Sequence, residues 1–174
     1  MGFITSLLKF IIGLIALVSL TVGITWFAAS FADGPWALIP GGAFSTGEVI
    51  NAEPDWNFVK DRQEVEFELV ATGRSRTTWI MVADGRIFIP SGYMNSTLGK
   101  LWKQWPIAAE ADGRAILRID GKLYHRNLVR IHEDPALPDV LSETRRKYLD
   151  QSDIPEPLAE VHSGNLWVFE MVRP

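Results

Sequence analysis

Residues 10–32 form an uncharged segment of 23 residues that is rich in isoleucine, leucine, valine and phenylalanine. As an α-helix rising about 1.5 Å per residue, the segment would extend about 34 Å, enough to cross a hydrocarbon layer of about 30 Å. Trp26 and Trp36 stand near its far end, where indole rings favour the headgroup region of a bilayer. The sequence therefore predicts a transmembrane helix, with residues 10–32 in contact with the lipid bilayer.

The charges that flank this segment predict its orientation. Lys9 and the α-amino group precede it, Asp33 follows it, and the next basic residue is Lys60. The positive-inside rule then places the N-terminus in the cytoplasm and the rest of the chain on the outer side, periplasmic or extracellular. The alternative is a cleaved signal peptide, because residues 30–32 (SFA) form a small-x-small cleavage site. The length of the apolar run favours an anchor that is retained.

Composition excludes several classes of function. The chain has no cysteine, so disulfides, thiolate metal sites and cysteine nucleophiles are excluded. A net charge of −4 argues against general nucleic-acid binding. Residues 74–130 nevertheless carry ten basic and four acidic residues. This basic stretch is interpreted either as a site for an anionic ligand such as phosphate or as a set of solvated strand faces.

The chain behind the anchor (residues 1–32) divides into a linker and one domain. Residues 33–47 (DGPWALIPGGAFSTG) are rich in glycine and proline and predict a juxtamembrane linker or ordered loop. Residues 48–174 have a common size for a single domain. Its first strand is predicted at residues 64–69 (EVEFEL), where acidic and apolar side chains alternate strictly.

Two Asp-Gly pairs, at residues 84–85 and 120–121, each stand between apolar runs. Such pairs predict two-residue hairpin turns, because both turn residues need a positive φ. The strands that they join are predicted at 77–83 with 86–91 and at 114–119 with 122–131. In the first hairpin Val82 would face Ile87 and Trp79 would face Pro90. Both faces of this hairpin are apolar, which predicts a central position covered on both sides.

Two short helices are predicted at residues 97–105 and 138–149. The second carries an apolar stripe and a favourable i,i+4 pair of Glu143 with Lys147. A last strand is predicted at residues 166–172. An antiparallel sheet of this size with two short helices is mainly β and indicates a closed or split β-barrel. The predicted fold is therefore a split β-barrel preceded by one N-terminal transmembrane helix.

Several short stretches between about residues 64 and 133 follow one another in a suggestive order. These stretches are 70–79 (VATGRSRTTW), 84–85 (DG), 87–92 (IFIPSG), 103–105 (KQW), 114–119 (RAILRI) and 121–124 (GKLY). Together they resemble the pyridoxamine-phosphate-oxidase-like split β-barrels, most of all their deazaflavin-dependent nitroreductase branch. The resemblance implies a six-stranded split barrel, often a homodimer, that binds FMN or a deazaflavin.

The resemblance also implies a cofactor site. In the family, arginine, lysine, serine and threonine side chains from the first hairpin and the following loop hold the phosphate, and arginine suits this task as a planar donor fork. The matching residues in this sequence are Arg74, Ser75, Arg76, Thr78, Ser91 and Lys103, with Trp79 or Trp105 near the ring. The glycine that follows in the family motif is absent after Ser75, and residues 110–113 (EADG) replace the family's Asn-Pro pair. Because of these two departures, a barrel that binds no cofactor is a second interpretation of the sequence.

Two functions from different classes follow. The first is a membrane-anchored oxidoreductase, in which the cofactor performs hydride chemistry on a small or lipophilic substrate. The second is a non-catalytic binding or assembly module of the cell envelope, built on the same barrel. The first requires Arg74, Arg76, Thr78 and Lys103 to converge on one pocket beside an aromatic wall. The second has them point separately into solvent. No motif predicts a catalytic acid, base or nucleophile, and no metal site is predicted.

Overall fold

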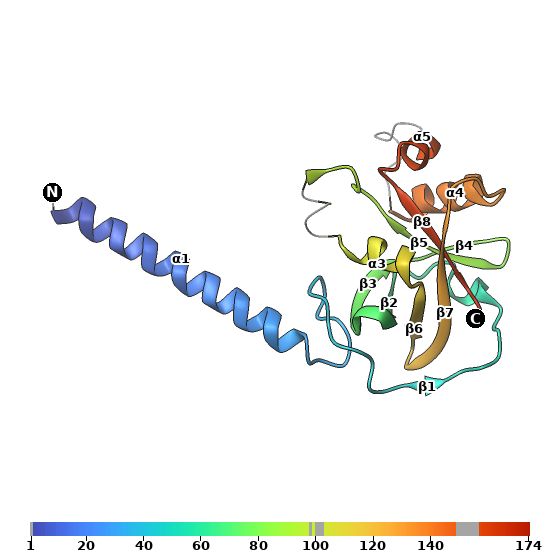
Figure 1. The fold of residues 1–174 in the computed structure, drawn as a ribbon, viewed down its shortest axis with the longest axis horizontal. Coiled ribbons are helices and arrows are strands. Elements are labelled where there is room, and N and C mark those ends of the chain that lie inside the picture. The colour runs from blue at the N-terminus through green and yellow to red at the C-terminus, as the bar shows by residue number, and fades with distance from the viewer. Residues whose placement is uncertain (1, 98, 100–102, 149–156) are drawn as a thin grey trace.

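The computed structural model describes residues 2–97, 99, 103–148 and 157–174 (Figure 1). The helices are α1 (Gly2–Ala29), α3 (Trp105–Ala111), α4 (Leu137–Tyr148) and α5 (Pro157–His162), with short 3₁₀ helices η1 (Trp56–Val59) and η2 (Val70–Thr72). The strands are β1 (Glu48–Val49), β2 (Glu64–Leu69), β3 (Arg74–Trp79), β4 (Met81–Ala83), β5 (Arg86–Ser91), β6 (Arg114–Ile119), β7 (Lys122–Ile131) and β8 (Trp167–Val172).

Helix α1 projects from the rest of the molecule as an isolated rod (Figure 1). It is 28 residues long, and of its residues only Ala29 is buried. Its length and composition suffice to cross a membrane, a test that a signal sequence near the N-terminus also passes. The predicted N-terminal apolar helix is confirmed, although it begins at Gly2 and ends at Ala29 rather than spanning residues 10–32. The choice between anchor and cleaved signal stays a prediction.

The sheet is mainly antiparallel and curls into a half-barrel. Its strand order is β3-β2-β6-β7-β8-β5-β4, and β1 pairs with β7 in parallel beside this path. β3 and β4 stand at opposite ends of the order, yet Ile80 alone separates them in the chain. Because one residue spans less than about 4 Å, the two ends of the sheet must meet at Ile80. The predicted class, mainly β with short helices behind an apolar helix, is confirmed.

Both predicted hairpin turns are present. Asp84 and Gly85 have φ of 49° and 70°, and Asp120 and Gly121 have φ of 50° and 73°. These left-handed conformations are the ones that a two-residue turn with the native strand twist requires. The second hairpin has the predicted bounds, as β6 and β7 pair along their length.

The first hairpin is shorter than predicted. Val82 faces Ile87 as expected, but β4 begins only at Met81. Trp79 belongs to β3 and pairs with Glu64 of β2 instead of Pro90. Pro90 pairs with β8. The prediction of a central hairpin is therefore wrong for β4, which ends the strand order, whereas β5 lies between β4 and β8. The physical reason is the closure at Ile80, since residues on either side of it belong to opposite ends of the curled sheet.

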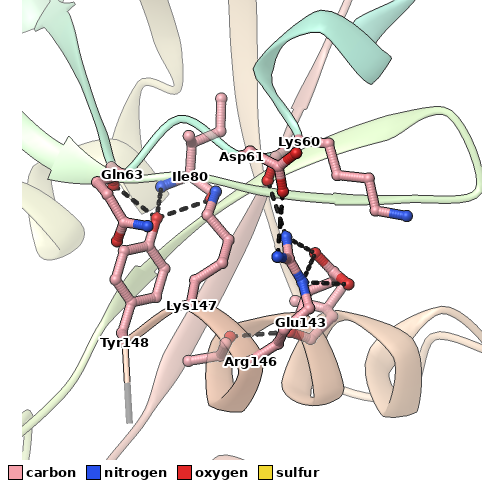
Figure 2. A network of polar contacts seen from close by, with 10 residues as sticks. Lys60, Asp61, Gln63, Ile80, Glu143, Arg146, Lys147 and Tyr148 are labelled. Atoms are coloured by element: carbon pink, nitrogen blue, oxygen red, sulfur yellow. Dashed lines mark hydrogen bonds and ion pairs between the residues drawn. The ribbon is translucent and has the colours of Figure 1, made fainter.

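Helix α4 supplies the polar groups that the backbone lacks at this closure (Figure 2). The Ile80 N–H donates to the Tyr148 hydroxyl at 3.1 Å, and Lys147 Nζ donates to the Ile80 carbonyl at 2.7 Å. The same hydroxyl lies 2.6 Å from the Gln63 carbonyl oxygen and 2.9 Å from that of Ile80, so it can donate its proton to either. Side chains of α4 thus replace strand pairing where the chain passes from β3 to β4.

Two apolar clusters lie on either side of the sheet. The interior of the half-barrel is filled by side chains that include Phe67, Leu117 and Phe169, with Trp105 of α3 beside them. The second cluster packs α4 against the outer face of β4, β5 and β8. Strand β5 contributes to both, because its alternate side chains point to opposite faces. The two clusters therefore cover the first hairpin on both faces, as predicted. Burying each large apolar side chain contributes about 1.5–3 kcal/mol.

The helical predictions are partly confirmed. α4 closely matches the predicted 138–149 helix, but Glu143 forms its ion pair with Arg146 at 2.8 Å rather than with Lys147. Lys147 points to Ile80 instead, which explains the difference. The predicted helix at 97–105 lies partly outside the described residues. Within them, Thr97 and Gly99 are helical as predicted, Lys103 and Gln104 are not, and Trp105 begins α3. The last strand, β8, starts one residue later than predicted.

The segment 33–47 is an ordered loop that lies along β3. Gly41 N–H donates to the Ser75 carbonyl at 2.9 Å, and the Phe44 N–H donates to buried Glu68 at 2.7 Å. Gly41 has to be a glycine, because a Cβ there would lie 1.9 Å from the Gly34 carbonyl oxygen. The loop therefore fixes the end of α1 against the half-barrel.

Candidate functional site

A hollow of about 650 Å³ lies where the half-barrel meets the end of α1. We call it the arginine pocket. The half-barrel and its loops contribute Pro40, Arg74, Arg76, Gln104 and Trp105. The helix contributes Gly23, Trp26 and Phe27, and the turn directly after it contributes Ser30. The pocket therefore has one cationic wall and one largely apolar wall.

Arg76 is the most unusual side chain of the pocket. It extends from β3 so that its guanidinium carbon lies 6.0 Å from the centre of the Phe67 ring and 5.8 Å from that of Trp105. Its Nε is buried and has no hydrogen-bond partner. Burial, together with the charge of Arg74, lowers the pKa of Arg76 to about 10. The group stays protonated at neutral pH but is poorly solvated, so an anion in the pocket would be stabilised beside it.

Arg74 lies two residues before Arg76 on the same face of β3. Its Nη2 donates to the Pro40 carbonyl at 2.9 Å. Neither arginine forms an ion pair with an acidic residue in the described part of the chain. The arginines that do form ion pairs are Arg62, Arg86, Arg114, Arg118, Arg126, Arg130 and Arg146. Five of the ten basic residues in the stretch 74–130 are thus paired with carboxylates within the fold, whereas Arg74 and Arg76 remain available to a ligand.

Asp33 holds the 33–47 loop in place where the end of α1 meets the half-barrel. Its carboxylate accepts hydrogen bonds from the Ser45 N–H at 2.8 Å, the Thr46 hydroxyl and Arg118 Nη1 at 2.9 Å. Burial opposes ionisation, but these donors outweigh it and lower the pKa of Asp33 to about 2. Arg118 also packs 4.0 Å from the centre of the Phe44 ring. The junction is therefore held by a charged cluster that is separate from the arginine pocket.

Three of the predicted cofactor residues lie elsewhere in the fold. Ser75 is buried and donates to the Gly42 carbonyl at 2.6 Å, so it fixes the 33–47 loop. Trp79 stacks on Tyr148 with ring centres 4.2 Å apart. Ser91 is buried with its hydroxyl 3.4 Å from the Met94 sulfur. Each of these side chains already has a structural partner.

The remaining predicted residues also separate. Lys103 Nζ donates to the Gly92 carbonyl at 2.7 Å and lies 5.6 Å from the Tyr93 ring centre. Burial lowers the pKa of Lys103. Thr78 is half-buried on β3 opposite Val65 of β2 and is not part of the pocket lining. Of the eight predicted residues, the structure brings Arg74, Arg76 and Trp105 together in one pocket.

Sequence reasoning missed the residues that complete the pocket. Pro40 and Gln104 come from loops, and Trp26 and Ser30 come from the end of α1. Trp26 carried a signal, because a tryptophan at the end of an apolar segment marks the membrane interface. Nothing in the local sequence indicates that this end faces β3. In the described residues, no group of three or more His, Cys, Asp or Glu side chains is placed to hold a metal ion.

Comparison of the sequence with models of protein families and with curated proteins finds no match. Among solved structures, a candidate pyridoxamine 5′-phosphate oxidase from Listeria innocua is similar over 66% of this chain and 86% of its own, with 10% identity and a TM-score of 0.42. A conserved hypothetical protein from Mycobacterium tuberculosis is similar over 75% of this chain and 84% of its own, with 16% identity and a TM-score of 0.45. The site is therefore interpreted from its own geometry.

Proposed function

We propose that the protein is a membrane-anchored binding protein that holds a phosphate-bearing ligand in the arginine pocket. The observation that carries the proposal is the pair Arg74 and Arg76, which line one hollow without a carboxylate partner among the described residues. Burying a guanidinium without a counter-ion is costly. A phosphate offers several acceptor oxygens and negative charge, and its charge-assisted hydrogen bonds to arginine offset that cost.

The anchoring part of the proposal rests on the surface of α1. Its large apolar side chains are exposed on every side, for example Ile15 at 60% and Leu20 at 61%. A helix that is apolar all round and exposed along nearly its whole length is stable in a hydrocarbon environment and unfavourable in water. With Lys9 directly before the uncharged segment 10–32, the helix would place the N-terminus in the cytoplasm and the half-barrel on the outer side.

A second candidate function is an oxidoreductase that uses FMN or a deazaflavin. One observation favours it: both pocket arginines come from the stretch 70–79 that resembles flavin-binding split barrels, and the Trp105 indole lies beside them. Arg74 and Arg76 would hold the cofactor phosphate, and the cofactor would supply hydride transfer to a small or lipophilic substrate. Ser75, Ser91, Lys103 and Trp79 would contribute little, because their side chains are engaged elsewhere. The homodimer stays a prediction.

The proposal is tested by titrating the full-length chain in neutral detergent with FMN, a deazaflavin, riboflavin and glycerol 3-phosphate, with calorimetry and visible absorbance as readouts. Phosphate-bearing ligands should bind, and Arg74→Gln or Arg76→Gln should weaken binding about tenfold or more, which corresponds to about 1.4 kcal/mol. The matched control is Arg145→Gln, because Arg145 is exposed on α4.

The outcomes separate the two candidates. A yellow complex with FMN that bleaches on reduction with dithionite and is reoxidised by an added acceptor faster than free FMN would support the oxidoreductase. Binding of glycerol 3-phosphate without flavin preference would support the binding protein. If no phosphate-bearing ligand, lipids included, distinguishes the wild type from the Arg74 and Arg76 variants, the proposed function is wrong.

A further inference from the structure

We infer that the ligand of the arginine pocket is an anionic phospholipid of the bilayer that α1 crosses. Its phosphate would lie at Arg74 and Arg76, and an acyl chain would run along the last turns of α1. The inference rests on the proposed function and deepens it by naming the class of ligand. It follows from the two chemically different walls of the pocket and from their position relative to the membrane.

The apolar wall is a stripe along α1. The lining residues Gly23, Trp26, Phe27 and Ser30 follow the spacing i, i+3, i+4, i+7, which places them on one face of the helix. Gly23 leaves open space on this face of α1, because a Cβ added at this position would meet nothing within 4 Å. An extended acyl chain fits a groove along a helix, whereas a compact sugar phosphate would leave the stripe uncovered.

The depth of the pocket also favours a lipid. Gly23 belongs to the part of α1 that would lie in hydrocarbon, and α1 ends at Ala29. Trp26 marks the boundary layer, where indole rings are favoured. If Trp26 lies in this boundary layer, Arg74 and Arg76, which line the same pocket, would lie close to the level of the lipid phosphates. A phospholipid crosses the same boundary with its own phosphate and chains, so it reaches both walls without leaving the bilayer.

Exposed apolar side chains beside the pocket indicate that the half-barrel sits against the membrane. Phe31, Trp36 and Leu38 follow α1 directly and are 76%, 48% and 89% exposed. The loop that carries them is fixed to β3 through Gly41 and Ser75. If these three side chains enter the interface, the loop holds β3 and its arginines at headgroup level.

The arginines are not engaged with the helix end itself. A helix C-terminus carries a partial negative charge that arginine side chains often complement. Arg74, however, donates to Pro40 in the loop, and Arg76 Nε has no partner. No hydrogen bond from either guanidinium to a carbonyl of α1 occurs in the described residues. Both arginines line the pocket and are therefore not occupied by the carbonyls at the helix end.

The test uses the full-length chain reconstituted into phosphatidylcholine vesicles that contain a minor share of phosphatidylglycerol. After mild extraction, the lipids retained by each chain are identified by native mass spectrometry. The wild type should retain phosphatidylglycerol over phosphatidylcholine, and Arg76→Gln should lower that retention about tenfold. Arg145→Gln should retain as much as the wild type, because it removes an equal charge from the exposed face of α4.

A second variant tests the acyl groove without touching the arginines. Gly23→Leu would fill the space beside α1, so phosphatidylglycerol retention should fall by a clearly larger factor than glycerol 3-phosphate binding. Equal retention by the wild type and Arg76→Gln, or equal retention of both lipids by the wild type, would overturn the inference. If glycerol 3-phosphate binds through the arginines but no lipid is enriched, the inference fails and the proposed function stands.

Discussion

Arg76 is a residue that is expected to lower the stability of the fold while it contributes to ligand binding. Its guanidinium is largely buried between Arg74 and the Phe67 and Trp105 rings, and its pKa is lowered to about 10. The two ring contacts contribute about 0.5–1 kcal/mol each at partly exposed sites. Desolvation of the charge opposes them, and no carboxylate among the described residues compensates. A residue kept in this state is typical of a binding site rather than of a structural core.

Arg76→Met tests this balance. We expect the free energy of unfolding at pH 7 to rise by about 1 kcal/mol, because the apolar side chain removes an uncompensated buried charge. Phosphate-ligand binding should be lost in the same variant. Thermal unfolding followed by tryptophan fluorescence, with Arg145→Met as the control, measures the effect. A clear loss of stability would mean that the guanidinium contributes net stabilisation and would contradict this account.

Tyr148 is the second residue whose role is individually testable. Burial raises the pKa of its hydroxyl to about 12, and the hydroxyl accepts the Ile80 N–H. In Tyr148→Phe that backbone N–H loses its partner at the closure of the sheet, so we expect a loss of about 1–2 kcal/mol in unfolding free energy. Tyr93→Phe is the matched control, because Tyr93 is 72% exposed. Equal unfolding midpoints for the two variants would show that the hydroxyl does not hold the closure.

At the scale of elements, the 33–47 loop couples α1 to the half-barrel through Asp33. The folded pKa of about 2 lies below the unfolded value of about 3.9. The stabilisation by this carboxylate is therefore complete above about pH 4 and is lost as the pH falls toward 2. The loop hydrogen bonds should follow the same dependence, because Asp33 accepts two of them.

Asp33→Asn should destabilise the protein by about 1–2 kcal/mol at pH 7, since the charged acceptor is lost. The difference from the wild type should shrink as the pH falls toward and below 2, because protonation then removes the charge of the Asp33 carboxylate. Unfolding midpoints measured across this range check the prediction. Asp84→Asn serves as the control, because asparagine tolerates the positive φ of that turn and Asp84 is exposed. A difference that is independent of pH would rule out the carboxylate charge as the cause.

At the scale of the whole molecule, the orientation of α1 decides where the pocket works. The chain has no cysteine, so single introduced thiols give a clean signal. In spheroplasts of an expressing bacterium, a membrane-impermeant maleimide should label Ser142→Cys directly. It should label Ser6→Cys only after lysis, because the N-terminus is predicted to be cytoplasmic. A chain shortened by residues 1–32 would instead show that the segment is a cleaved signal peptide.

Local patterns determined much of the fold in advance. The two Asp-Gly turns were predictable because their positive φ values depend on two adjacent residues. Strand 64–69 was predictable because its side-chain alternation follows strand periodicity. The apolar stripe of α4 was predictable from its helical spacing, and α1 was predictable from its long uninterrupted run of apolar residues. In each case, residues close together in sequence carry the whole signal.

The tertiary structure alone decided the closure at Ile80 and the composition of the arginine pocket. The partner of Thr77–Trp79 is β2, which local propensity cannot distinguish from β5. Arg74, Arg76 and Trp105 were predictable from the sequence by resemblance, but Ser75, Ser91 and Lys103 have the same residue types that bind phosphate and are engaged within the fold. Pairing and pocket lining depend on contacts between residues far apart in the chain, whose energies are set by the folded arrangement and not by neighbouring residues.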